Sequence, residues 1–187
     1  MKDLSLHILD LSQNSVSAGA SLVKITIHED IEMNKLTIYI EDNGAGMDKD
    51  FLERVKDPFV TTRTTRKVGL GIPLMLASCT RCEGDLVIES QKNVGTKLTA
   101  TFKHSHIDRA PMGDMSETML SLVLAGNDSS KAVDFVYRHI IGHRDFCFDT
   151  REIRTALGND VQLCEPDVLM WIKDYINEGL VNLRGGV

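Results

Sequence analysis

Apolar residues recur every three or four positions at the start of the chain, which predicts an amphipathic helix over about residues 3–18. Gly19 follows where a C-terminal cap is expected. Polar residues lie beside the apolar face at steps of three and four, and they are His7, Asp10, Asn14 and Ser17. A polar row of this kind is common on a solvated helix, so it does not identify a site by itself.

Two segments then alternate apolar and polar residues, as half-buried strands do, at 22–28 and 36–42. In the second segment Asp42 shares a face with the apolar residues Leu36, Ile38 and Ile40. A carboxylate there is unfavourable unless a group donates to it, and Gly44 and Gly46 allow a ligand to approach closely. A nucleobase amine would be a suitable donor, and a turn-capping aspartate is the alternative.

A loop rich in threonine and cationic residues covers about residues 57–68, after a short helix that begins near Asp48. It leads into Gly69-Leu70-Gly71, which opens an apolar helix through about Cys79. Glycines before a helix expose backbone N–H groups and the positive end of the helix dipole, which favour phosphate. We therefore expect a phosphate turn with a basic loop that closes over it, and a plain surface loop is the alternative.

The sheet is expected to continue with strands at 86–90 and 96–104, joined by a turn at 93–95. Thr96 shares its strand face with Leu98, Ala100 and Phe102, so it points toward the apolar layer as Asp42 does. Its hydroxyl could relay a water to a base or cap the turn.

Residues 105–115 contain Pro111 and Gly113 and are interpreted as a linker. Beyond it, residues 116–187 predict a small α+β appendage, with helices at about 116–125, at 149–157 and from Pro166, and a hairpin over 134–148. The last helix has an apolar stripe of Val168, Trp171, Ile172, Tyr175 and Ile176. Either the domain itself, or a partner or second subunit in a homodimer, is expected to cover this stripe.

The composition narrows the class of protein without naming an activity. The chain has 187 residues and a formal charge of -6, which gives no general affinity for nucleic acid or anionic lipid. No segment has the roughly 18 apolar residues that a membrane-spanning helix needs. Four cysteines do not form a secreted disulfide framework, so a cytoplasmic location is expected.

Cysteine and histidine spacings leave a metal or redox site open as a rival interpretation. Cys79 and Cys82 have ligand spacing, and Cys147 and Cys164 could complete a set of four sulfur ligands. Histidines recur at short spacing in two further places, namely His104, His106 and Asp108, and His139 and His143. Ordinary burial of the cysteines and solvation of the histidines are the alternatives.

The first 104 residues carry an ordered series of motifs that resembles the GHKL superfamily of gyrase-like, heat-shock-chaperone-like, histidine-kinase-like and mismatch-repair-like ATPases. The motifs are Asp10-x-x-x-Asn14, Asp42-x-Gly44-x-Gly46-Met47, the segment 57–63, Gly69-Leu70-Gly71 and Gly95-Thr96. Residues 59–63 are most similar to the histidine-kinase branch, as in a stand-alone histidine-kinase-like ATP-binding domain. The resemblance implies an α+β two-layer sandwich, a mixed sheet with helices on one face, over residues 1–104.

The resemblance also implies roles for individual residues. Asn14 would ligate magnesium, Asp42 would bind the adenine amine, and Gly44, Gly46 and Met47 would line the base pocket. Thr61, Thr62, Arg63, Arg66 and Lys67 would form the ATP lid, Gly69, Leu70 and Gly71 the phosphate turn, and Thr96 a water-mediated contact to the base. Asp10 stands where hydrolytic branches and the serine-kinase anti-sigma branch carry a glutamate general base, and it is the candidate catalytic residue.

The expected cofactors are therefore ATP and Mg²⁺, and the leading hypothesis is a regulatory kinase or slow ATPase. Sensor kinases place a phosphoaccepting histidine on a dimerising hairpin ahead of this domain, whereas this sequence starts with the helix that bears Asn14. A phosphoacceptor is accordingly expected in another protein, acted on in trans. The alternative is an ATP-gated protein-binding module with little turnover.

Overall fold

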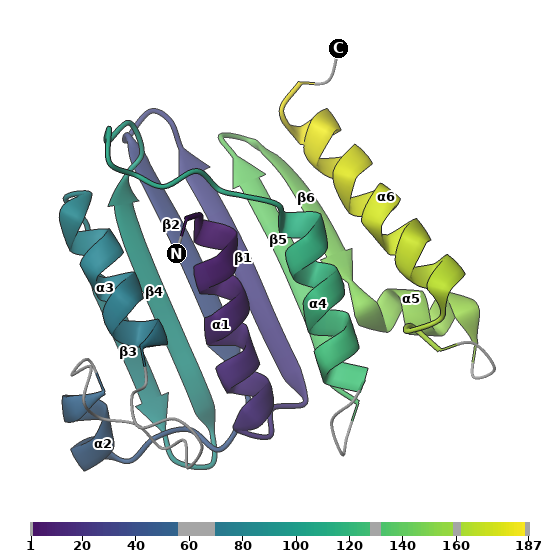
Figure 1. The fold of residues 1–187 in the computed structure, drawn as a ribbon, viewed down its shortest axis with the longest axis horizontal. Helices are drawn as coiled ribbons and strands as arrows, with labels where there is room; N and C mark the ends of the chain where they lie inside the picture. Colours follow the sequence, from purple (N-terminus) through teal and green to yellow (C-terminus); the bar gives the residue numbers. More distant parts are fainter. Residues whose placement is uncertain (1, 56–69, 128–131, 159–161, 186–187) are drawn as a thin grey trace.

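The computed structural model describes residues 2–55, 70–127, 132–158 and 162–185, and its strands form one sheet with helices on one face (Figure 1). The strands are β1 (Leu22–Asp30), β2 (Lys35–Asp42), β3 (Leu86–Gln91), β4 (Gly95–Lys103), β5 (Asp134–Ile141) and β6 (Arg144–Asp149). The helices are α1 (Leu4–Ser17), α2 (Lys49–Arg54), α3 (Gly71–Arg81), α4 (Met115–Asn127), α5 (Thr150–Leu157) and α6 (Pro166–Leu183). The predicted α+β sandwich with a mixed sheet is confirmed.

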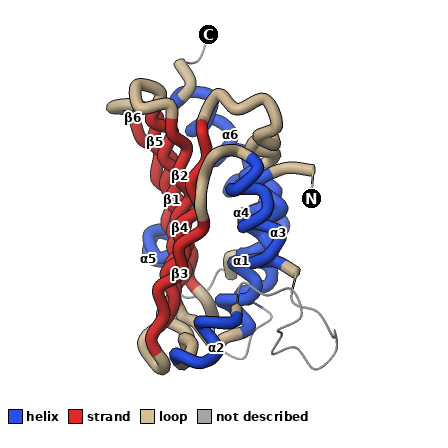
Figure 2. The backbone as a smooth tube through the Cα atoms, turned by 90° about the vertical axis from the view of Figure 1, so that its left-hand side faces the viewer, coloured by secondary structure: helices blue, strands red, loops and turns tan. Residues whose placement is uncertain are grey.

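The six strands lie in the order β3-β4-β2-β1-β5-β6. The β1–β5 pair is parallel and the other neighbouring pairs are antiparallel. Helices α1, α3 and α4 pack side by side on one face, as the edge-on view shows (Figure 2). Within the described ranges, no helix combines the length and apolar character that crossing a bilayer requires.

Helix α1 lies in the middle of this helix layer, between α3 and α4. Its apolar stripe is buried against the sheet and comprises Leu4, Ile8 and Leu11. The helix ends where the sequence predicts. Gly19 follows it with a positive φ of 75°, a conformation that residues with a side chain disfavour. The polar row beside the apolar stripe is therefore held in a fixed direction along the layer.

Strand β5 continues the sheet on the free side of β1, so the predicted C-terminal region shares the core of the first 104 residues. Side chains from both parts lie in one buried cluster, which includes Ile25, Ile27, Phe135, Tyr137 and Ile176. The predicted linker also contacts α1, where Pro111 and Met112 carbonyls accept hydrogen bonds from the N–H groups of Leu4 and Ser5. These bonds satisfy donors that every helix leaves open at its start.

A buried polar cluster links the two parts at one end of the sheet. Glu29 at the end of β1 contacts two imidazoles, with Oε1 2.8 Å from His139 Nε2 and Oε2 2.8 Å from His104 Nε2. His139 lies in β5 and has no exposed surface, and its Nδ1 is 2.8 Å from the hydroxyl of Tyr137. The sequence leads us to expect solvated histidines, but His104 and His139 are hydrogen-bond partners of a carboxylate.

The proton positions in this cluster follow from the acceptor at its centre. The hydrogen bond from His139 is the largest effect that lowers the pKa of Glu29, to about 2, so the carboxylate is ionised and only accepts. His139 Nε2 therefore carries a proton. Burial raises the pKa of Tyr137, so its hydroxyl stays protonated, 2.8 Å from His139 Nδ1.

We predict that Glu29→Gln destabilises the whole chain at neutral pH, because Glu29 joins β1 to β5 and to the residue after β4. A carboxyl with a lowered pKa contributes stability that is present above its unfolded pKa of about 4.5 and is lost as pH falls toward about 2. The difference in unfolding free energy between wild type and variant should therefore shrink over that pH range.

Urea unfolding followed by circular dichroism and by fluorescence of Trp171, the single tryptophan, measures this difference. Both signals should give one midpoint, since α6 and the first strands share a core. The matched control is Glu32→Gln in the β1–β2 turn, where the side chain is exposed and little change is expected. A pH-independent difference, or two separate midpoints, would contradict the prediction.

Candidate nucleotide-binding site

The candidate site lies at the end of the sheet opposite Glu29, where β2 ends and β4 begins. Asp42 is the cross-strand partner of Thr96, and Thr96 is the partner of Ser90 on β3. Residues that are paired across neighbouring strands point to the same face, so the three polar side chains form a row at the end of the apolar layer. The sheet register thus creates a polar edge beneath the helices.

Both oxygens of the Asp42 carboxylate have a donor from the protein. Ser15 Oγ on α1 donates to Oδ2 over 2.6 Å, and the backbone N–H of Gly44 donates to Oδ1 over 2.9 Å. The bond to α1 agrees with the predicted orientation of Asp42 toward the helix face. A carboxylate offers about four acceptor positions, so capacity remains for a further donor such as an amine.

The loop after β2 is fixed on two sides by close backbone packing. Gly46 has a φ of 61°, and a Cβ atom there would lie 2.0 Å from the carbonyl oxygen of Gln91. Ala45 N–H donates to Ala18 O over 2.9 Å, and Ala45 O accepts from the N–H of Asn93 over 2.7 Å. The loop therefore connects the end of α1 with the β3–β4 turn and leaves no space for a side chain at position 46.

Ser90 joins Met47, Gly95 and Thr96 into one hydrogen-bond network. Its hydroxyl accepts a hydrogen bond from the N–H of Met47 over 2.8 Å and lies 2.9 Å from Thr96 Oγ1. It also donates to the carbonyl of Gly95 over 2.9 Å. Thr96 and Met47 are thus positioned by the same side chain, close to Asp42.

Asp10 and Asn14 lie against the first residue of α3. A Cβ atom at Gly71 would be 2.2 Å from Asp10 Oδ2 and 3.5 Å from Asn14 Nδ2. The residue before the helix, Leu70, makes no side-chain cap to the first turn. The positive end of α3 therefore lies next to a carboxylate and an amide from α1.

Helix α1 thus brings most of the described candidates together. Through Ser15 it contacts Asp42, and through Asp10 and Asn14 it contacts Gly71. The other candidates at the β2 and β4 ends, Gly44, Gly46, Met47 and Thr96, surround Asp42 through the bonds given above. Thr61, Thr62, Arg63, Arg66, Lys67 and Gly69 lie outside the described residues.

Two serines in this network were not among the candidates from the sequence. Ser15 falls at helical spacing from Ile8 and Leu11, and Ser90 alternates with Leu86 and Ile88 on β3. A hydroxyl on an otherwise apolar face is the signal that could have identified both of them.

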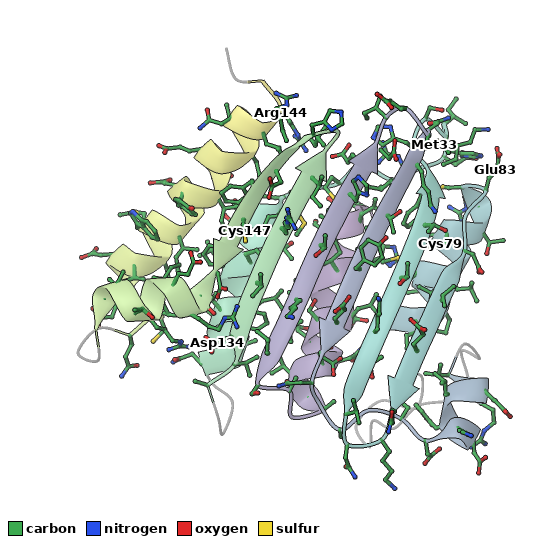
Figure 3. The ribbon with its side chains drawn as sticks, turned by 180° about the vertical axis from the view of Figure 1, so that it is seen from behind. Met33, Cys79, Glu83, Asp134, Arg144 and Cys147 are labelled. Atoms are coloured by element: carbon green, nitrogen blue, oxygen red, sulfur yellow. The ribbon has the colours of Figure 1, made fainter. Side chains whose placement is uncertain are left out.

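The metal interpretation of the cysteines and histidines gains no support from the described residues, among which no group of three or more His, Cys, Asp or Glu could hold a metal ion. Cys79 on α3 and Cys147 on β6 lie toward opposite edges of the sheet (Figure 3). Burial raises the pKa of Cys79 to about 12, so its thiol is protonated at neutral pH. Cys79 and Cys82 are buried core residues.

Together these features define an α+β sandwich protein with a polar site at one end of its sheet, formed by the first helix, the second strand and a glycine at the start of α3. The chain belongs to the family of histidine kinase-, DNA gyrase B- and HSP90-like ATPases, whose model matches residues 2–106. The family's description names its members as ATPases.

Known relatives include several sensor kinases. A putative sensor protein of Shewanella frigidimarina is 31% identical over 98 residues, which are 52% of this chain and 15% of the relative. Sporulation kinase E of Bacillus subtilis is 28% identical over 101 residues, or 54% of this chain and 13% of the kinase. A probable C4-dicarboxylate sensor kinase of Halalkalibacterium halodurans is 33% identical over 101 residues, or 52% of this chain and 19% of the kinase.

This chain therefore spans less than a fifth of the length of each of these relatives. Among solved structures, the N-terminal domain of a DNA repair protein is similar with a TM-score of 0.51 and 15% sequence identity. That similarity covers 79% of this chain and 52% of the other, and it shows a shared fold.

We predict that Gly46→Ala is more destabilising than Gly19→Ala, although both residues have a positive φ. At Gly19 an added Cβ meets nothing within 4 Å, so only the backbone strain of about 1–2 kcal/mol is expected. At Gly46 the Cβ also meets the backbone of Gln91, which must move. Urea unfolding of the two variants measures the difference, and equal losses would refute the proposed close packing.

Proposed function

We propose that this protein binds Mg-ATP at the sheet end, with the adenine amine on Asp42 and the triphosphate directed toward the start of α3. The observation that carries the proposal is the geometry of Asp42, whose carboxylate is oriented by Ser15 and by the N–H of Gly44 and retains acceptor capacity. Beside it, α1 presents Asn14 to Gly71, so base and phosphate positions are joined by one helix.

Magnesium fits the oxygen donors available at the phosphate end. Asn14 supplies an amide oxygen and Asp10 a carboxylate, and Mg²⁺ prefers hard oxygen ligands, with phosphate oxygens and water in the remaining positions. Asn14 is the residue that we propose as the direct ligand. When bound, the ion would neutralise charge on the phosphate oxygens.

The proposed chemistry is transfer of the γ-phosphoryl group to a protein acceptor in trans or, more slowly, to water. The acceptor oxygen or nitrogen forms a bond to the γ-phosphorus, the bond to the β–γ bridging oxygen breaks, and ADP leaves. Asp10 is proposed to take the proton from a hydroxyl or water nucleophile. Because an aspartate is one methylene shorter than a glutamate, it reaches less far toward that nucleophile, which favours slow turnover.

The sensor kinases among the relatives support a regulatory role in the cytoplasm with a protein partner. The four cysteines are free thiols, which agrees with a reducing compartment. We also propose that the protein forms a homodimer, and sedimentation measures its oligomeric state.

We predict that Asp42→Asn weakens binding of a non-hydrolysable ATP analogue by about 10–100-fold, because a hydrogen bond to a charged group is worth about 1.5–3 kcal/mol. Glu41→Gln is the matched control, since Glu41 precedes Asp42 on β2, points to the other face and pairs with Lys97. Isothermal titration calorimetry measures both affinities. If the wild type shows no binding heat, or both variants lose affinity equally, the proposal fails.

We predict that Asp10→Asn leaves affinity within about twofold and reduces ATP loss by about 100-fold or more, as expected for removal of a general base. The assay follows γ-labelled Mg-ATP with the protein alone and with cell extract. Label on a protein indicates a kinase, and label in free phosphate indicates a hydrolase. If wild type retains ATP intact, the chain is an ATP-gated binding module.

A further inference from the structure

A groove lies at the far edge of the sheet, between α5, α6 and the end of β6. Its cavity has a volume of about 480 Å³, within the range of roughly 300–1,000 Å³ that is usual for binding pockets. Its apolar lining comprises Phe148, Ile153, Leu157, Val168, Trp171 and Tyr175. We call this surface the aromatic groove, and α5 lies near the amino-terminal end of α6 there (Figure 1).

The outer half of the α6 stripe is open to solvent. Ile172 and Ile176 are fully buried, whereas Trp171 is 51% exposed and Tyr175 is 41% exposed. The two aromatic rings stack with centroids 5.1 Å apart and an interplanar angle of 14°, and Phe146 packs on Tyr175 at 5.5 Å. The exposed rings are therefore preorganised by a third ring from β6, and the residues that the structure describes cover only part of the stripe.

Acidic side chains stand at the rim of the aromatic groove. They are Asp149, Glu152 and Asp167. Arg151 pairs with Asp149, whereas Glu152 and Asp167 form no ion pair with any described residue. Residues 105–187 hold 13 acidic and 8 basic residues, so this part carries most of the net charge of -6.

The charge decides between the occupants that could cover such a surface. A second copy of this chain would bring its own Glu152 and Asp167 toward the same rim, and like charges in contact are unfavourable. A basic partner would be attracted instead, and its cations could also lie over the faces of Trp171 and Tyr175. The groove between two helices matches an incoming helix that inserts apolar side chains at helical spacing.

We propose that the aromatic groove binds an amphipathic helix of a partner protein, with an apolar face flanked by lysine or arginine. The apolar face fills the space over Phe148 and Ile153, and the cations meet Glu152 and Asp167. The surface uses none of the residues of the nucleotide site, so the inference stands apart from the proposed ATP chemistry.

The position of Trp171 provides a direct measurement, because it is the only tryptophan in the chain. The probe is a synthetic 18-residue amphipathic helix of leucine and lysine. We expect a saturable shift of Trp171 emission to shorter wavelength, with an affinity that falls as salt is added. Two peptides serve as controls, one with glutamate in place of lysine and one of the same composition in scrambled order, and neither should bind.

The double variant Glu152→Lys/Asp167→Lys should weaken binding of the leucine–lysine peptide about tenfold or more. Glu32→Lys/Glu89→Lys is the matched control, since it makes the same change in net charge on exposed residues away from the groove. Binding of an ATP analogue should be unchanged in both, which separates this test from that of the nucleotide site.

Several outcomes would overturn the proposal. These are the absence of a saturable Trp171 shift, equal binding of the glutamate or scrambled peptide, and equal weakening by the control variant. A concentration-dependent dimer in which Trp171 is shielded would show that a second copy is the occupant instead.

Discussion

The structure depends on the contact of α1 with two separate parts of the chain along its length. Ser15 holds the carboxylate of Asp42 at the end of β2, and Asp10 and Asn14 on the same helix lie against the start of α3. Because Leu4, Ile8 and Leu11 are fixed in the core, the polar row cannot rotate away from these partners. A site formed in this way is only as well ordered as the packing of α1.

Local patterns were sufficient to predict what depends on neighbours in the sequence. The apolar period of α1, the parity that turns Asp42 inward and the glycine after α1 all describe short segments, and the structure agrees with each. The roles of Ser15 and Ser90 depend on which strand lies beside which, and this register is set by contacts between distant residues. The same holds for the contact between Glu29 and His139, which are 110 residues apart in the sequence.

The C-terminal residues belong to the same sheet, which β5 and β6 widen beyond β1. Glu29 connects them to the first strands through His139, while α6 is attached through Ile172 and Ile176. The proposed nucleotide site and the aromatic groove therefore lie in different places on one continuous sheet. A partner on the groove could be held without obstructing the residues proposed to bind ATP.

The parallel pairing of β1 with β5 has a consequence for how the chain is made. Leu22 and Asp134 are register partners. Strand β1 therefore cannot pair with β5 until more than a hundred further residues have left the ribosome. At a synthesis rate of about 5–20 residues per second this interval lasts roughly 5–20 s. Throughout it the nascent protein displays an unfinished strand edge, which is the kind of surface that chaperones shield from aggregation.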